Sequence, residues 1–295
     1  MGYSPRSSGR PLSTVYHLLS TRVVVVAVVL GALLFYLFPI LWMLATSFKA
    51  PGDVFAMPPK HLFLPTLVNY RKVFVAAGQW VGATEFPRRL ANSLIIGSIS
   101  TVLAVALGTL SAYAFSRFPM KGKDDLLFFI LSTRMLPPVA IVIPIFLMYR
   151  DWGLRDTHLG LILLYTVFNM AFAVWMMKGF IDEIPKDYEE AAMCDGYSRA
   201  RAFFKVVLPQ AIPAMAATAV FCLITAWNEF AFALVLTGAN ARTAPPEIVG
   251  KIRPEGIQWG EVAASGFVML LPVLIFTFLV RNHLLRGVTF GAVRR

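Results

Sequence analysis

The segment YEEAAMCDGYSRARAFFKVVLP, residues 188–209, is a polar stretch between two long apolar runs. Gly196 lies inside it, and a glycine adopts the positive φ of a tight turn without steric cost. Glu189 and Glu190 come near its beginning, where carboxylates favour the positive end of a helix, and basic residues follow in the second half. The segment therefore predicts two short helices joined at Gly196, exposed to water between two membrane-spanning helices.

The composition of the whole chain is typical of a membrane protein. Of its 295 residues, 58% are hydrophobic and only 15% are charged, and the mean hydropathy is +0.68. A soluble domain is nearer half apolar. The net charge of +11 comes from basic residues scattered singly around apolar blocks, which is typical of residues that flank membrane spans and does not indicate nucleic-acid binding.

Six apolar runs are long enough to cross a bilayer, which takes about 20 residues at 1.5 Å each. Backbone groups in lipid must bond within their own segment, so each run is expected to be a helix. The chain is therefore predicted to be an all-α membrane protein with six transmembrane helices. We place them at 23–47, 91–116, 125–149, 157–179, 208–237 and 261–281.

The connecting segments complete the predicted organisation. The run from Val23 to Ser47 is longer than the apolar part of a cleavable signal peptide and is expected to remain as the first span. Five prolines in the long first loop favour short helices in irregular chain, either as a docking surface for an external protein or as a plain connector. The predicted parts are the cytoplasmic N-terminal tail 1–22, the periplasmic loop 48–90, the core 91–281 with the hairpin at 183–207, and the cytoplasmic C-terminal tail 282–295.

The distribution of Lys and Arg predicts the orientation in the membrane. With the N-terminus inside, fifteen of them lie on the cytoplasmic side and eleven outside. The short turn 117–123 holds three, whereas many of the outer ones lie in the long first loop, and short loops carry the signal. We expect the N-terminus, the C-terminus and the hairpin to face the cytoplasm.

The second span carries a stripe of small residues at every fourth position. On a helix these lie on one face, which lets another helix approach closely in lipid. The stripe therefore predicts a tight helix pair, unless it is chance in an alanine-rich run. Its members are Ser100, Ala104, Gly108, Ala112 and Ser116.

Arg134 lies inside the third predicted span, where a charge costs at least about 2.5–3.5 kcal/mol and must face protein or water. Pro137 and Pro138 follow, and they are expected to break the helix and to free carbonyls that the guanidinium can bond. Glu229 in the fifth span is a possible partner, but straight helices place the two at roughly 14 and 31 Å from the cytoplasmic end. The pairing stays open.

Polar residues within the spans are candidates for the wall of a transport path. Amides and carboxylates with aromatic rings beside them hold hydroxyl-rich ligands, and Trp175 and Trp227 are such rings. The alternative is that the polar groups only bond helix to helix. The candidates are Arg134, Asn169, Trp227, Asn228 and Glu229.

No motif for chemistry is present in the sequence. A phosphate-binding loop needs Gly-Lys followed by Ser or Thr, but Lys123 and Lys251 are followed by Asp124 and Ile252. The four histidines and two cysteines have no catalytic or metal-binding spacing. We expect no enzyme activity and no cofactor or metal on this chain.

The hairpin nevertheless has a recognisable spacing. Glu190, Ala191 and Ala192 are followed after three residues by Gly196, and later by Val206 and by the pair Leu208 and Pro209. This resembles the EAA loop of bacterial ABC importer permeases, with Val206 where the family usually has Ile. SAYAFSR at 111–117, RMLPP at 134–138, WNEF at 227–230 and the closing GAVRR are similar to the maltose-type branch of sugar permeases.

This resemblance implies a half-transporter of the bacterial inner membrane for a sugar, oligosaccharide or polyol. It implies four kinds of partner: a second related permease, a pair of identical ATPase subunits that bind ATP and Mg²⁺, an extracytoplasmic solute-binding protein and the lipid bilayer. The alternative is a secondary carrier driven by an ion gradient, which would be expected to show an inverted repeat. The residues that would couple to the ATPase are Glu189, Glu190, Ala191, Ala192, Asp195, Gly196, Arg199, Leu208 and Pro209.

Overall fold

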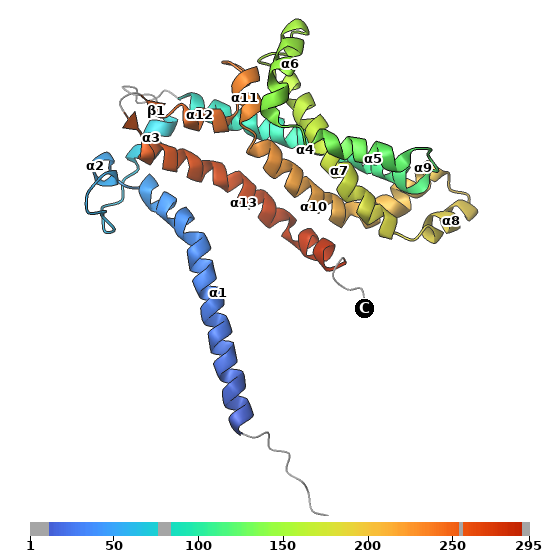
Figure 1. The fold of residues 1–295 in the computed structure, drawn as a ribbon, viewed down its shortest axis with the longest axis horizontal. Helices are drawn as coiled ribbons and strands as arrows, with labels where there is room; N and C mark the ends of the chain where they lie inside the picture. The colour runs from blue at the N-terminus through green and yellow to red at the C-terminus, as the bar shows by residue number, and fades with distance from the viewer. Residues whose placement is uncertain (1–11, 76–83, 254–255, 291–295) are drawn as a thin grey trace, which may run out of the picture.

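The computed structural model describes residues 12–75, 84–253 and 256–290, and it is almost entirely helical (Figure 1). The exception within the described residues is a short antiparallel pair, β1 (Ile252–Arg253) with β2 (Gly256–Ile257). The helices are α1 (Leu12–Ser47), α2 (Pro51–Val54), α3 (Val68–Phe74), α4 (Glu85–Arg117), α5 (Lys123–Thr133), α6 (Pro138–Asp151), α7 (His158–Glu183), α8 (Asp187–Cys194), α9 (Arg199–Ala202), a π-helix at Phe203–Val207, α10 (Leu208–Trp227), α11 (Ala231–Leu236), α12 (Ala244–Val249) and α13 (Trp259–Phe290).

Five stretches of helix within the described residues are long and apolar enough to cross a membrane, or up to six if the bent pair α5 and α6 forms one span. α5 and α6 meet at an angle of 89°, because Pro137 and Pro138 end the first helix and begin the second. The third predicted span is thus broken between Thr133 and Pro138, as expected from the two prolines. The bend is far too large for one straight crossing.

Several predicted boundaries differ from the observed ones. The fifth predicted span, 208–237, is interrupted between Trp227 and Ala231 and so consists of α10 and α11. The predicted limits at 22/23, 90/91 and 281/282 all fall inside helices, since α1, α4 and α13 extend beyond them. Hydropathy finds the apolar part of a helix, but helices continue past the hydrocarbon wherever their polar ends still bond internally.

The close helix pair predicted from the small-residue stripe is α4 against α7. Ser100, Ala104 and Ala112 are completely buried. At Gly108 an added Cβ would lie 2.6 Å from the Cβ of Ala173 and 3.1 Å from its carbonyl carbon, so only glycine allows this approach. α10 packs on the same pair, and α13 lies against α10 (Figure 1).

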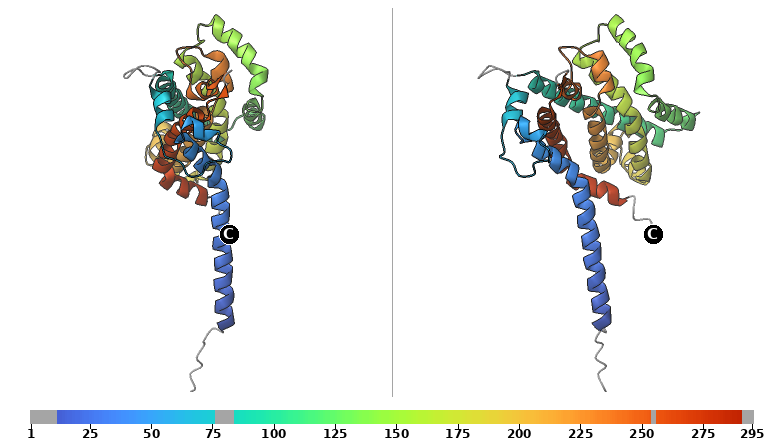
Figure 2. Two further views of the ribbon diagram at one scale, coloured as in Figure 1. Left: turned by 90° about the vertical axis from the view of Figure 1, so that its left-hand side faces the viewer. Right: turned by 60° about the vertical axis from the view of Figure 1, so that its left-hand side comes forward.

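The first helix stands apart from this bundle. Its side chains from Val23 to Trp42 are exposed, and only its last turns pack against α13, where Met43 contacts Gly266. Figure 2 shows α1 projecting away from the other helices in both views. The apolar surface of α1 is therefore left for lipid or for another chain.

Asp156 joins the loop after α6 to the loop after α11. Its carboxylate accepts hydrogen bonds from the backbone N–H groups of Gly238 (2.8 Å), Asn240 (3.1 Å) and Ala241 (3.0 Å). Asp156 itself has φ +56°, a region in which aspartate is tolerated. The contact connects segments more than 80 residues apart in the sequence.

We expect this contact to make stability depend on pH. Burial alone would raise the pKa of Asp156, but the backbone N–H donors outweigh it and lower the pKa below 3.8. A carboxyl with a lowered folded pKa stabilises above its unfolded value and loses that contribution as the pH falls through the folded value. The melting temperature in detergent should therefore fall below about pH 4. The Asp156→Asn variant should have a lower melting temperature at neutral pH, and that temperature should decrease less as the pH is lowered. An unchanged decrease would contradict this.

Candidate functional site

The predicted turn at Gly196 is present, and α8 before it is a short helix, but α9 after it continues through the π-helix into α10 as one helix from Arg199 to Trp227. Gly196 has φ +88°, and its N–H bonds to the carbonyl of Met193 at 3.0 Å. Ser198 caps α9 by accepting a hydrogen bond from the N–H of Arg201. The hairpin therefore forms from local signals, a left-handed glycine and a serine cap.

The two adjacent glutamates of the hairpin have different surroundings. Glu189 is only 4% exposed and accepts a hydrogen bond from the hydroxyl of Tyr113 at 2.8 Å, as well as an ion pair from Arg117. Glu190, one residue later, is exposed, and its carboxylate forms no hydrogen bond or ion pair within the described part of the chain. One glutamate thus faces the bundle and the other faces away from it.

The remaining coupling candidates are distributed around this pair. Ala191, Asp195 and Gly196 are exposed, Ala192 is half-buried, and the guanidinium of Arg199 lies over the ring of Phe118 at 5.0 Å. Leu208 packs on the apolar cluster at the foot of the hairpin, whereas Pro209 is exposed in the first turn of α10. The exposed part of the hairpin therefore combines small residues with charges of both signs.

A cavity of about 210 Å³ brings together three of the predicted path residues. Arg134, Asn169 and Glu229 line it, together with Tyr165 and Thr225. The carboxylate of Glu229 accepts from the Tyr165 hydroxyl at 2.6 Å and from the backbone N–H groups of Phe232 and Ala233 at the start of α11. Asn169 accepts from Thr225 at 2.7 Å.

The open question of an Arg134 and Glu229 pair now has a structural answer. Both side chains line one cavity, which straight-helix depths did not predict, because the chain bends after Arg134 and α10 ends before Glu229. No ion pair joins them within 4.0 Å in the described residues. Arg134 instead donates to the carbonyl of Phe168 on α7 at 3.1 Å rather than to a carbonyl freed by the prolines.

Two predicted path residues do not line this cavity. Trp227 is 3% exposed, and its indole N–H donates to the carbonyl of Met269 on α13 at 3.1 Å, so it belongs to the packing between α10 and α13. Asn228 is exposed and its amide bonds back to the carbonyl of Ile224 at 2.9 Å. The ring of Trp227 therefore points into the bundle in this structure, and its place on a transport path stays a prediction.

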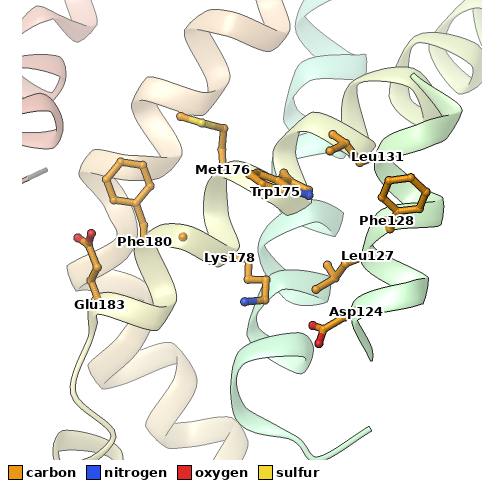
Figure 3. Close-up of a pocket in the computed structure, with 10 residues that line it drawn as sticks. Asp124, Leu127, Phe128, Leu131, Trp175, Met176, Lys178, Phe180 and Glu183 are labelled. Carbon is orange, nitrogen blue, oxygen red and sulfur yellow. The ribbon is translucent and has the colours of Figure 1, made fainter. Parts of the chain in front are cut away.

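The largest cavity described, about 670 Å³, lies between α5 and α7 (Figure 3). Leu127, Phe128 and Leu131 come from α5, and the half-exposed ring of Trp175 on α7 lies on the side toward them. Trp175 therefore lines this cavity, whereas Trp227 lines neither of the two cavities.

α7 contributes lining residues to both cavities. Asn169, Phe172, Trp175 or Met176, and Gly179 follow one another at helical spacing along it. The guanidinium of Arg134 lies 5.4 Å from the centre of the Phe172 ring, between the two cavities. The surface formed by these residues is called the α7 face below.

The contacts of Tyr113, Arg117 and Tyr165 were missed by the sequence reasoning. The first two lie in the SAYAFSR motif, so a signal existed, but nothing in the sequence showed what they touch. Among the described residues, no group of three His, Cys, Asp or Glu side chains is arranged to hold a metal ion.

Comparison with solved structures shows a known fold. A chain from a bacterial ABC transporter involved in the import of the acidic polysaccharide alginate superposes with a TM-score of 0.68 at 23% identity, over 96% of this chain and 100% of that one. The two chains therefore share one fold over nearly their whole length.

The sequence comparisons give the family. The model described as "Binding-protein-dependent transport system inner membrane component" matches residues 104–289. The chain is 33% identical over 274 residues to the trehalose/maltose transport system permease protein MalG of Thermococcus litoralis, covering 91% of this chain and 96% of that protein. It is 36% identical over 259 residues to the probable ABC transporter permease protein y4oR of Sinorhizobium fredii, covering 88% and 91%. The chain belongs to the family of binding-protein-dependent transport system inner membrane components.

Family membership confirms the resemblance inferred from the hairpin and decides the class of function. The chain is a non-catalytic permease subunit of an ABC importer, and a separate ATPase subunit hydrolyses the ATP. The alternative of a carrier driven by an ion gradient has no support.

Proposed function

We propose that this permease forms half of the translocation path of an importer for a sugar, oligosaccharide or polyol, and that its hairpin docks on the ATPase. The observation that carries the docking is the division of the hairpin into a buried foot at Glu189 and an exposed tip from Glu190 to Gly196. Because the base of the hairpin is fixed to the membrane helices, the exposed tip moves as a rigid body together with the ATPase that binds it.

The proposed assembly contains this chain, a second related permease, two copies of the ATPase and an extracytoplasmic solute-binding protein. ATP and Mg²⁺ are bound by the ATPase. The chain crosses the bacterial inner membrane six times, with α5 and α6 forming one bent span, and both termini and the hairpin face the cytoplasm. The loop between α1 and α4 then faces the binding protein.

The proposed path runs along the α7 face. Its cavities offer an amide, a guanidinium and a carboxylate at Asn169, Arg134 and Glu229, with the ring of Trp175 further along. Hydroxyl-rich ligands are held by such groups, and relatives named for trehalose/maltose and diacetylchitobiose transport support this substrate class. Searching the neighbouring genes for a solute-binding protein and then measuring which ligands it binds would identify the substrate.

The docking is tested by the Gly196→Ala variant in proteoliposomes that contain the complete importer. The φ of +88° costs a non-glycine residue about 1–2 kcal/mol, so the hairpin turn is distorted. We expect ATP hydrolysis to continue while substrate uptake falls by at least about tenfold, within the usual range of coupling between sites. The Glu190→Gln variant should weaken the attachment of the ATPase.

Gly122→Ala is the matched control, because Gly122 also has a positive φ of +68° and open space around it, but lies between α4 and α5. It carries the same backbone cost outside the hairpin, and uptake should be retained. Normal uptake by both hairpin variants would overturn the docking.

The native cysteines test the orientation without any substitution. Cys194 on the hairpin is exposed and Cys222 is buried. A membrane-impermeant maleimide should label the permease, expressed without its ATPase, in inside-out vesicles and not in right-side-out vesicles, and Cys194→Ser should abolish the label. Labelling from the outer face would reverse the proposed topology.

A further inference from the structure

Glu189 is held by the last turns of α4 at both of its carboxylate oxygens. The Tyr113 hydroxyl donates to one oxygen at 2.8 Å, and the Nε of Arg117 donates to the other. The side chains of Glu189 and Arg117 are only 6% and 5% exposed. Both charges are thus removed from water and satisfied by each other.

Arg117 makes a second contact that closes this arrangement. Its Nη2 donates to the carbonyl of Ile184, the residue at which α7 ends, at 2.9 Å. Arg117 therefore holds the end of α7 and the beginning of α8 at the same time, and the linker between them is clamped at both ends.

Tyr113 also touches the other limb of the hairpin. Its ring lies 4.6 Å from that of Phe203, at the start of the π-helix that leads into α10. One side chain thus bonds to α8 through its hydroxyl and packs on the returning limb through its ring. Neither limb can tilt against α4 without breaking one of these contacts.

Burial of the ion pair between Arg117 and Glu189 restricts how far the hairpin can shift. Two charges taken out of water gain little net stability, but leaving one of them without its partner is costly. A discrete geometry is therefore strongly favoured over small displacements. α4 in turn packs closely on α7 at Gly108 and Ala173. A displacement of the base of the hairpin at Glu189 is therefore transmitted through α4 to α7, which lines the proposed path.

We propose that Tyr113 and Arg117, through Glu189, are positioning residues that join the hairpin rigidly to α4 and so convert ATPase movement into movement of the α4 and α7 pair. This rests on the proposed docking of the hairpin. It assigns separate roles to neighbouring glutamates: Glu190 faces the ATPase, and Glu189 connects the hairpin to the membrane helices.

The test compares Glu189→Gln with Glu190→Gln in the complete importer in proteoliposomes, measuring both ATP hydrolysis and substrate uptake. Glu189→Gln should keep the ATPase bound and active but lower the substrate taken up per ATP by about tenfold, within the usual range of coupling between sites. Arg117→Gln should do the same, and the double variant should lose no more than either single one, because the two act as one unit.

Three comparisons keep the outcome decisive. Asp125→Asn, an exposed charge on α5, should leave the ratio unchanged. If Glu189→Gln does not fold, Tyr113→Phe removes one hydrogen bond without creating a cavity and should lower the ratio by a smaller factor. Exchange of the two charges in an Arg117→Glu, Glu189→Arg variant should restore part of the ratio.

The failures of the two proposals are distinguishable. Suppose that Glu189→Gln and Tyr113→Phe both take up the normal amount of substrate per ATP while Gly196→Ala is uncoupled. This result would overturn the proposed role of Tyr113 and Arg117 and leave the docking of the hairpin on the ATPase intact. If the losses of uptake per ATP from Arg117→Gln and Glu189→Gln add up in the double variant, the proposed role of Tyr113 and Arg117 is also overturned. Normal uptake in Gly196→Ala and Glu190→Gln would overturn the docking itself.

Discussion

Replacing Gly108 by leucine is expected to separate α4 from α7 while both helices stay inserted. Even one added carbon would lie 2.6 Å from the Ala173 Cβ and 3.1 Å from its backbone, so relaxation would have to move the helix. Overpacking costs typically about 1–3 kcal/mol, and we expect the upper end because backbone atoms are involved. The measurements are the melting temperature and the protease resistance in detergent, both of which should fall.

The control for this prediction is Gly31→Ala in α1, where an added Cβ meets nothing within 4 Å. Alanine is favoured over glycine inside a helix by about 0.8–1.0 kcal/mol in peptides, so this variant should be neutral or slightly more stable. A Gly108→Leu protein that melts like the unaltered one would show that the α4 and α7 contact is not needed for the fold.

The second large effect is expected from Trp227→Ala. The buried indole fills the space between α10 and α13 and donates a hydrogen bond to the Met269 carbonyl. Truncating a buried aromatic residue costs about 3–5 kcal/mol, so the melting temperature should fall sharply. Substrate preference should not change in whatever protein remains folded, because the ring does not line either path cavity.

Trp175→Ala is the matched comparison, since the same residue type here is 55% exposed and lines the larger cavity. Its melting temperature should stay close to that of the unaltered protein. If the ring contacts the substrate with an energy of about 0.5–1.5 kcal/mol, uptake should fall by about twofold to tenfold. The reverse pattern, with loss of stability at Trp175 and of uptake alone at Trp227, would contradict the placement of both rings.

Much of the fold could be predicted from run lengths and spacing. Hydropathy located the helices that can span a membrane, the stripe through Gly108 predicted the closest helix pair, and Pro137 and Pro138 predicted a break. Each of these signals is local, and each acts through backbone geometry that the neighbouring residues already determine.

The parts that could not be predicted depend on distant residues. The break before Ala231 has no proline or glycine behind it, and it is stabilised by the Glu229 carboxylate at the start of α11 and by Tyr165 on another helix. The direction of the Trp227 ring is set by Met269 on α13.

The difference between the two adjacent glutamates has the same origin. On a helix their side chains point about 100° apart, and nothing local decides which one is buried. Tyr113 and Arg117 on α4, more than 70 residues earlier, make that choice for Glu189.

The separation of α1 from the bundle has a consequence for how the chain is made. Among these helices α1 is made first, and from Val23 to Trp42 it is not covered by any other part of the chain that the structure describes. During synthesis α1 is therefore stabilised in the bilayer only by its apolar side chains and its internal hydrogen bonds. Exchanges of one apolar residue for another between Val23 and Trp42 should therefore leave the fold of this subunit intact and affect only a neighbouring chain that covers that helix.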